Sequence, residues 1–224
     1  MKDARLHRIL LICAACAVLL AAGAAAGAAP DNPADQEDKS PTTIIRQATQ
    51  EVLDILRDPD LQGEDHTEKR RRMLREAVSD MFDWRAMARS SLARHWRDRT
   101  EGEKEEFTRL FRKLLENTYL ERIRRNTDAE LRYVDAEVEG EYAAVSTVAV
   151  TGDGTKVPIE YQLKKVSNEK REQNPELPGW QVYDVSVEGV SLINNYRAQF
   201  RDILIGRSYE QLVRMLRQKV EKDT

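Results

Sequence analysis

The hydrophobic pattern of this chain changes its period at residue 130, and this change limits the folds open to it. Before residue 130 the apolar side chains recur every three or four residues, most clearly in residues 107–123, as on one face of an α-helix. From residue 130 to 187 they alternate with polar side chains, as in strands with one buried and one solvated face. Helices and strands in separate runs indicate the α+β class.

Four strands are expected, over residues 130–139, 142–151, 156–164 and 180–187. The sequence Gly152-Asp153-Gly154 predicts the hairpin turn between the second and third strands. Pro158 predicts an edge position or a bulge, because proline cannot donate a hydrogen bond to a neighbouring strand. The alternation slips between Val182 and Tyr183, which predicts a bulge or burial on both faces there.

Six helices are expected, four before the strands and two after them. Each start is marked by a residue that can accept hydrogen bonds from free backbone N–H groups. These are Ser40, Asp65 with Glu68, Asp83, Thr100 with Glu103, Ser191, and Ser208 with Gln211. The polar residues 167–178, between the third and fourth strands, are expected to form a loop.

The first residues are typical of an export signal. A basic start precedes an apolar run over residues 9–20, and Ala26-Gly27-Ala28 matches a small-residue cleavage site. We therefore expect a signal peptide over residues 1–29, a flexible segment over residues 30–40 and a single domain over residues 41–222. The alternative is an uncleaved anchor, since residues 9–29 are long enough to span a bilayer.

Removal of the signal peptide would leave a chain without cysteine, because Cys13 and Cys16 both lie within it. Such a chain has to depend on its hydrophobic core rather than on disulfides. The formal charge would fall from −3 to −5, because three basic residues and one acid would be lost. This balance argues against a nucleic-acid partner. The basic clusters at residues 69–72 and 122–125 lie among acids on helical patterns, so solvated faces are expected.

Motifs for catalysis are absent from the sequence. It contains no phosphate-binding glycine loop and no nucleophile elbow. His66 and His95 lack a second ligand at metal-site spacing. Asp184 interrupts an apolar strand, and we expect it to accept hydrogen bonds rather than to catalyse. The sequence therefore predicts a protein that is not an enzyme and that has neither a metal site nor a cofactor.

Three segments together carry a resemblance to a known family. They are Met81-Phe82-Asp83-Trp84-Arg85-Ala86-Met87-Ala88-Arg89 with His95-Trp96-Arg97, then residues 180–192 (WQVYDVSVEGVSL), and residues 195–200 (NYRAQF). In this order, over residues 42–222, the chain resembles the periplasmic phospholipid-binding proteins of the Mla system, also called the toluene-tolerance auxiliary family. The two later segments form a long pattern that is far more specific than any short motif.

The resemblance implies helices wrapped on a four-stranded antiparallel twisted sheet that encloses an apolar lipid cavity. It also implies a monomeric carrier in the periplasm, with phospholipid as its cargo. The carrier would move lipid between an outer-membrane lipoprotein complex and an inner-membrane ABC transporter complex, and so maintain the lipid asymmetry of the outer membrane. Two alternatives are an α+β protein-interaction module without a lipid and an exported hydrolase.

The acyl chains are expected to contact apolar side chains of the long helix, the inner face of the sheet and the penultimate helix. The candidates are Phe82, Met87, Phe107, Phe111, Leu114, Leu115, Tyr133, Ile159, Tyr161, Leu163, Tyr183, Val185, Ile193 and Phe200. Tyr196 and Arg197 are candidates for the cavity mouth. Each lining candidate has ordinary core packing as its alternative, because the sequence does not separate a packed face from a cavity wall.

Overall fold

The structure, a computed structural model, describes residues 40–124 and 129–222. The predicted signal peptide, residues 1–29, lies outside the described residues, as does all but Ser40 of the predicted flexible segment, residues 30–40. Within residues 40–124 and 129–222, no helix is both long enough and apolar enough to cross a bilayer.

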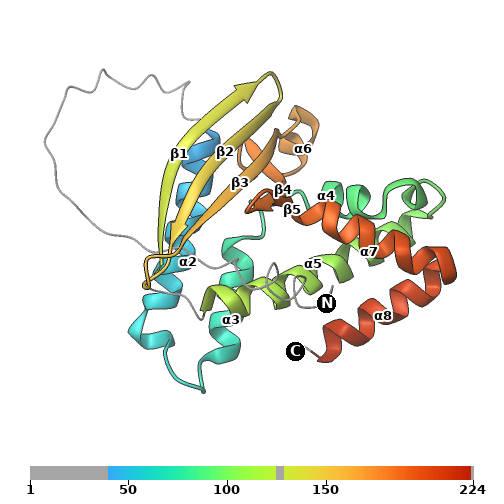
Figure 1. Ribbon diagram of the computed structural model, residues 1–224, viewed down its shortest axis with the longest axis horizontal. Helices are drawn as coiled ribbons and strands as arrows, with labels where there is room; N and C mark the ends of the chain where they lie inside the picture. The colour runs from blue at the N-terminus through green and yellow to red at the C-terminus, as the bar shows by residue number, and fades with distance from the viewer. Residues whose placement is uncertain (1–39, 125–128, 223–224) are drawn as a thin grey trace, which may run out of the picture.

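The strands form one antiparallel sheet in which each strand pairs with the next along the chain (Figure 1). They are β1 (Glu130–Glu139), β2 (Tyr142–Val150), β3 (Lys156–Lys165), β4 (Trp180–Val187) and β5 (Val190–Ser191). The α+β prediction is confirmed, with five strands in place of four. The fifth strand has only two residues, so it is too short to produce a recognisable alternation.

Two bulges bend the sheet. On β1 the pairing with β2 shifts between Tyr133 and Asp135, and on β4 Tyr183 has no partner on β3. The predicted irregularity at Val182 and Tyr183 is therefore confirmed as a bulge. Because a bulge bends its strand and increases the local twist, the sheet is bent at these two points. The turn at residues 152–154 also forms as predicted, and Gly154 adopts a φ of +84° that favours glycine.

Pro158 lies in β3, a central strand, so the prediction of an edge position or a bulge is wrong. It pairs with Val148 of β2, and its carbonyl accepts a hydrogen bond from the backbone N–H of Glu188 at 2.9 Å. Within a strand the N–H and C=O of one residue point to the same side. The missing N–H therefore faces the end of β4, where the ladder between β3 and β4 has already stopped.

Helices lie before, within and after the sheet. They are α2 (Pro41–Arg57), η2 (Pro59–Leu61), α3 (Thr67–Ala77), α4 (Trp84–Leu92), η3 (Ala93–Trp96), α5 (Glu101–Arg124), α6 (Asn168–Gln173), α7 (Leu192–Gly206) and α8 (Tyr209–Lys222). Helix α6 falls within residues 167–178, which the sequence predicts to be a loop. Its six residues bury no side chain, so no apolar periodicity marked it.

Most of the predicted helix starts are confirmed by their capping hydrogen bonds. The Asp83 carboxylate accepts from the N–H of Ala86 at 3.0 Å. Thr100 and Glu103 cap each other reciprocally, at 3.3 and 2.7 Å. The predicted Asp65–Glu68 cap is wrong, because α3 is capped by His66 without a side-chain hydrogen bond.

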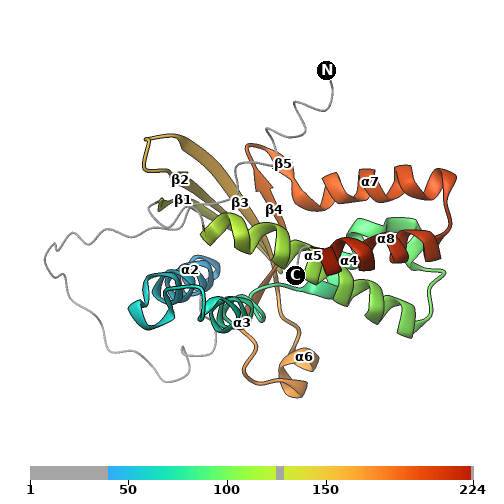
Figure 2. The same cartoon turned by 90° about the horizontal axis from the view of Figure 1, so that it is seen from below.

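The helices divide into two groups around the sheet. Helix α2 lies across the inner face of the sheet, where Ile44 and Ile45 pack against Val145, Leu163 and Val182. Helices α4, α5, α7 and α8 form a separate bundle beside the sheet, which we call the helical lobe (Figures 1 and 2). In both views α5 runs from this lobe back towards the sheet, so it bridges the two parts of the molecule.

Candidate functional site

The inner face of the sheet is almost entirely apolar. The cross-strand pairs place Val145, Tyr161 and Val185 in one row, and Thr147, Ile159 and Val187 in the next. Thr147 is the polar member of these rows. Its hydroxyl donates to the carbonyl of Ile159 at 3.0 Å, so it presents no unpaired polar group to this face.

The structure divides the predicted lining residues between the sheet and the helical lobe. On the inner face of the sheet it places Tyr133, Ile159, Tyr161, Leu163 and Val185. Inside the helical lobe it places Met87, Phe107, Phe111, Leu114, Leu115, Ile193 and Phe200. Two residues remain, Phe82 and Tyr183, and each lies in a different environment from these groups.

Side chains in the helical lobe pack on one another. The ring of Phe111 lies 5.2 Å from that of Tyr196 and 5.7 Å from that of Phe200, both edge-on. Phe107 stacks on Phe111 at 6.0 Å, and neither ring is exposed to solvent. Such edge-on and offset contacts are the usual arrangement of aromatic rings in protein cores. The lobe therefore has the geometry of a packed core.

The inner face of the sheet is covered less completely. Ile159 and Leu163 are buried, whereas Tyr133, Tyr161 and Val185 are only partly buried. These three side chains also contact both of the apolar clusters on the sheet, one beneath α2 and one near Ala129. They are therefore apolar side chains on the inner face that solvent partly reaches, and we call Tyr133, Tyr161 and Val185 the inner-face strip.

Phe82 connects the sheet to the helical lobe. It forms a parallel bridge to Val182, where the N–H of Asp83 donates to the Val182 carbonyl at 2.9 Å. The ring of Phe82 is partly buried and packs against the apolar clusters of both regions. The apolar surface thus runs without interruption from the inner-face strip to the lobe.

Tyr183 is the bulge residue of β4, and the structure places it on the outer face of the sheet. Its ring lies 6.2 Å from that of Tyr142, whose neighbour Ala143 points to the inner face. Burial raises the pKa of the Tyr183 hydroxyl. The bulge explains the difference from the prediction, because simple alternation would put Tyr183 on the same face as Val185.

The two predicted mouth residues belong to the helical lobe. Tyr196 is buried, with its ring against Phe111 and Phe200. Arg197 is exposed, and its Nε donates to the Ser90 carbonyl at 2.8 Å, which joins α7 to α4. The structure therefore gives neither residue a position on the inner-face strip.

Asp184 joins β4 to the start of α7. Its carboxylate accepts from the Ser191 hydroxyl at 2.5 Å and from the N–H of Ile193 at 3.1 Å. Ser191 in turn caps α7 by accepting from the N–H of Asn194 at 3.0 Å. The prediction that Asp184 is hydrogen-bonded is confirmed.

A buried ionic network ties α3 to α5. The Glu116 carboxylate, with 5% of its side chain exposed, accepts from Nε of Arg112 at 2.6 Å and lies 3.7 Å from Nε of Arg75. Arg112 also lies over the Trp84 ring at 5.3 Å. A buried carboxylate is tolerated only when it is paired, so these arginines are structural.

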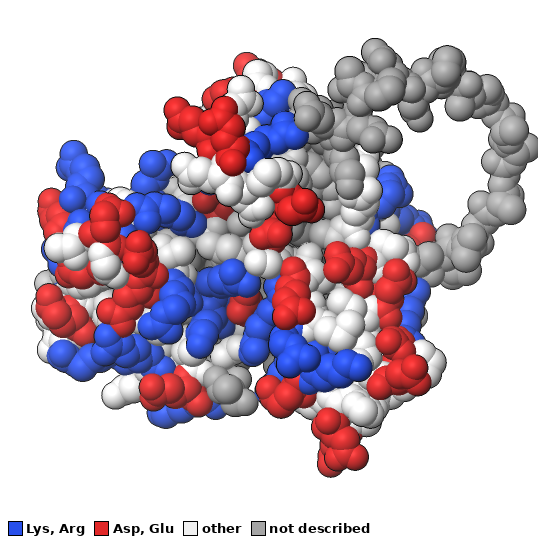
Figure 3. Space-filling model, turned by 180° about the vertical axis from the view of Figure 1, so that it is seen from behind, with Lys and Arg blue, Asp and Glu red and all other residues white. Residues whose placement is uncertain are grey.

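The basic cluster at residues 69–72 lies on a mostly solvated face, as expected. Arg71 and Arg72 pair with Glu68 and Glu76. Arg70 differs, because it is buried and its guanidinium donates to the Leu61 carbonyl. Basic and acidic side chains are interspersed over the face in Figure 3. The second cluster, at residues 122–125, lies outside the residues whose side chains are described.

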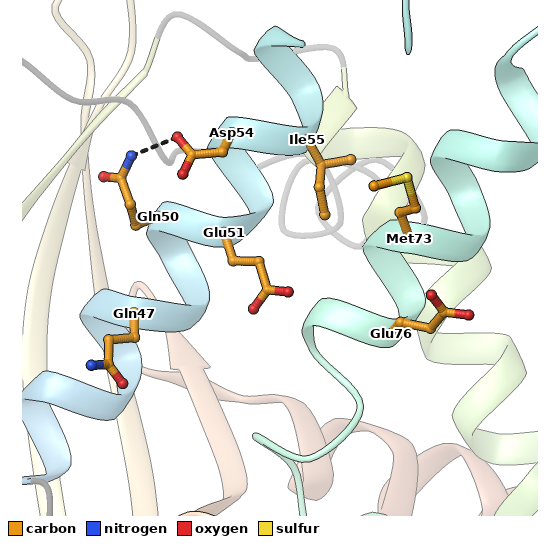
Figure 4. A pocket seen from close by; sticks show the side chains of 7 residues that line it. All are labelled: Gln47, Gln50, Glu51, Asp54, Ile55, Met73 and Glu76. Carbon is orange, nitrogen blue, oxygen red and sulfur yellow. Dashed lines mark hydrogen bonds between the residues drawn. The ribbon is translucent and has the colours of Figure 1, made fainter. Parts of the chain in front are cut away.

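A groove between α2 and α3 has a volume of about 510 Å³ (Figure 4). Its lining is mixed, with amides and carboxylates around a small apolar floor: Gln47, Gln50, Glu51, Asp54, Ile55, Met73 and Glu76. This groove was not predictable from the sequence, because its polar residues have the spacing of an ordinary solvated helix face. None of the predicted lining residues lies in it.

Metal-ligating side chains do not gather in this structure. Across residues 40–124 and 129–222, no three His, Cys, Asp or Glu side chains could together hold a metal ion. His95 is partly buried and accepts from Nε of Arg94 at 3.3 Å.

Comparison with known proteins identifies the family. The family model of the MlaC protein matches residues 46–218, which is most of the chain. The chain belongs to the MlaC family. The resemblance seen in the sequence over residues 42–222 is thereby confirmed. No curated protein matches this member of the MlaC family.

A solved structure shows the same fold. It is that of the phospholipid-binding protein from Ralstonia solanacearum in complex with a phospholipid. The two chains superpose with a TM-score of 0.68 at 22% identity, over 80% of this chain and 96% of the other. The MlaC-family chain described here thus shares the overall arrangement of that protein.

Proposed function

We propose that this protein binds phospholipid and carries it, as a soluble shuttle, between two membranes. Membership of the MlaC family carries this proposal, and the fold of the phospholipid-binding protein from Ralstonia solanacearum supports it. The apolar surface around the inner-face strip is suited to acyl chains, because it presents mostly hydrocarbon and the hydroxyl of Thr147 is hydrogen-bonded within the sheet.

The energetics of acyl chains set the requirement for such a carrier. Each buried methylene contributes about 0.8 kcal/mol. Two tails with roughly 30 methylenes would then cost on the order of 25 kcal/mol to expose to water. The carrier must therefore cover both tails almost completely. Because the membranes at either end offer the same apolar environment, the carrier has only to approach their affinity, and tighter binding would prevent release.

The lipid headgroup is expected to remain at the surface. It carries charge, and burial of an unpaired charge costs several kcal/mol. A carrier that leaves the headgroup in water discriminates little between headgroup types. We therefore expect similar occupancy by zwitterionic and anionic phospholipids with the same tails.

The wider assignment follows from the family. We propose that residues 1–29 direct export and that residues 41–222 act as one monomeric lipid-binding domain in the periplasm. The partners proposed are an outer-membrane lipoprotein complex and an inner-membrane ABC transporter complex, and the outcome is maintenance of outer-membrane lipid asymmetry. We propose no catalytic role, no cofactor other than the lipid cargo and no nucleic-acid partner.

Organic extraction of the purified protein, followed by mass spectrometry, tests the proposal. We expect phospholipid at about one molecule per chain. An extract without lipid, from a chain that also takes up none from vesicles, would favour the protein-interaction module. Appearance of free fatty acid or lysophospholipid during incubation would instead indicate a hydrolase.

A further inference from the structure

One cation lies beside the inner-face strip. Arg46 extends from α2, and the centre of its guanidinium lies 4.1 Å from the centroid of the Tyr133 ring. Tyr133 belongs to the strip and is partly buried, whereas Arg46 is exposed. The adjacent residue of α2, Ile45, is completely buried against the sheet, so the backbone that carries Arg46 is fixed in position.

Arg46 differs from the other arginines near the sheet in the contacts that it makes. Arg132, one residue before Tyr133, pairs with Glu130 at 2.8 Å. Arg75 and Arg112 are held by the buried Glu116. Within the described part of the chain, Arg46 forms no ion pair, and its guanidinium lies over the Tyr133 ring.

The stacked geometry leaves the guanidinium able to bind an anion. A guanidinium that lies over an aromatic face keeps its N–H donors in its own plane, directed away from the ring. Those donors form a planar fork that matches two oxygens of a phosphate group. The Tyr133 ring thus orients Arg46 while the N–H donors of the guanidinium stay available for an anion.

We propose that Arg46, held on the Tyr133 ring, binds the phosphate of the phospholipid whose tails lie on the inner-face strip. The inference rests on the proposed function and adds the residue that recognises the polar end of the cargo. Phosphate is common to all glycerophospholipids, so recognition here is compatible with tolerance of different headgroups. The same chemistry would also suit free phosphate, and the experiment has to separate the two sources.

The predicted mouth residue Arg197 is less suited to this role. Its Nε is already used in the hydrogen bond to the Ser90 carbonyl, and it lies on the helical lobe beside α4. Arg46 instead is exposed and lies directly over the ring of Tyr133, a residue of the inner-face strip.

A competition between two lipids tests the proposal. Protein freed of lipid is incubated with vesicles that contain phosphatidylethanolamine and diacylglycerol with the same tails, and the lipid retained per chain is measured by mass spectrometry. The wild type is expected to favour the phospholipid. Arg46→Ala should lower the ratio of phospholipid to diacylglycerol about tenfold, the scale of one charge-assisted hydrogen bond, with diacylglycerol uptake unchanged.

Two variants and one competitor complete the design. Arg46→Lys, which keeps the charge and loses the planar fork, should fall between Arg46→Ala and the wild type. Arg89→Ala, which removes an exposed arginine from α4, should match the wild type. Inorganic phosphate at millimolar concentration should leave phospholipid uptake unchanged, and displacement by it would overturn the assignment of the site to a lipid phosphate.

The results that would overturn the role of Arg46 differ from those that would overturn the carrier function. An unchanged ratio in Arg46→Ala, or an equal loss of both lipids, would overturn the role of Arg46 and leave the carrier function intact. Uptake of neither lipid by the wild type would overturn the carrier function, and the role of Arg46 with it. Equal melting temperatures of the wild type and Arg46→Ala would confirm that the change in ratio does not arise from unfolding.

Discussion

The helical lobe and the inner face of the sheet are both apolar, yet their side chains are buried to different degrees. In the lobe, Phe107 and Phe111 are fully enclosed by other side chains. On the sheet, Tyr133, Tyr161 and Val185 have similar chemistry but remain partly exposed. A side chain that is already enclosed contributes to stability, whereas one that is partly exposed still has surface to offer to a ligand. Completeness of burial, rather than hydrophobicity, therefore separates the core of this protein from its candidate site.

Truncation in the lobe should have the largest effect on stability. Phe111→Ala removes a ring that contacts Phe107, Tyr196 and Phe200, and it should lower the free energy of unfolding by about 3–5 kcal/mol. Val185→Ala on the inner-face strip should cost less than about 1.5 kcal/mol, because part of the side chain is already in water. Urea denaturation of both variants measures the difference. Equal losses would contradict the division into core and site.

Added bulk on the strip should have the next largest effect, on ligand rather than on stability. Val185→Trp should lower the phospholipid bound per chain about tenfold, because the larger side chain fills space on the inner face, with less than about 1.5 kcal/mol lost in stability. Tyr183→Trp is the matched control, since it changes the neighbouring bulge residue on the outer face. Mass spectrometry of extracted lipid gives the readout. Normal lipid content in Val185→Trp would remove the strip from the site.

The smallest expected effect is a pH dependence of stability that arises from Tyr209 in the helical lobe. Burial raises the pKa of Tyr209 to about 12, and its hydroxyl donates to the Glu103 carbonyl at 3.0 Å. As the pH rises above the ordinary tyrosine value of about 10, the unfolded chain loses this proton while the folded chain keeps it. Stability should therefore fall between about pH 10 and 12.

Tyr209→Phe isolates this contribution. The variant lacks the ionisable group, so its melting temperature should fall less steeply than that of the wild type over the same pH range. Parallel slopes for the two proteins would show that Tyr209 does not contribute to the pH dependence.

Local chemistry explains which parts of the fold the sequence could predict. Thr100 with Glu103, Asp83 and Ser191 cap helices as predicted, because a cap depends on residues within one turn. The alternation of apolar and polar side chains located β1 to β4, because this pattern also depends only on residues that are close in the sequence. The six residues of α6 and the two of β5 carry no such periodic signal.

The candidate site was only partly predictable, because exposure depends on contacts between distant segments. Alternation correctly assigned Tyr161 and Val185 to the inner face, but it could not separate them from buried Phe111 in the lobe. The bulge at Tyr183 places that side chain on the outer face of the sheet. The break in alternation in the sequence located the bulge, but it did not show to which face Tyr183 would point. Arg46 was missed because an exposed arginine on a helix ordinarily indicates only a solvated face.

Strand β4 is attached to two helices of the helical lobe. Val182 is hydrogen-bonded to Met81 and Asp83 at the start of α4, and Asp184 holds the start of α7. Displacement of β4 would thus break contacts with two helices at once. Strands β1 and β2 instead pack against α2. Loss of the Val182 and Asp184 contacts would therefore loosen the starts of α4 and α7 together.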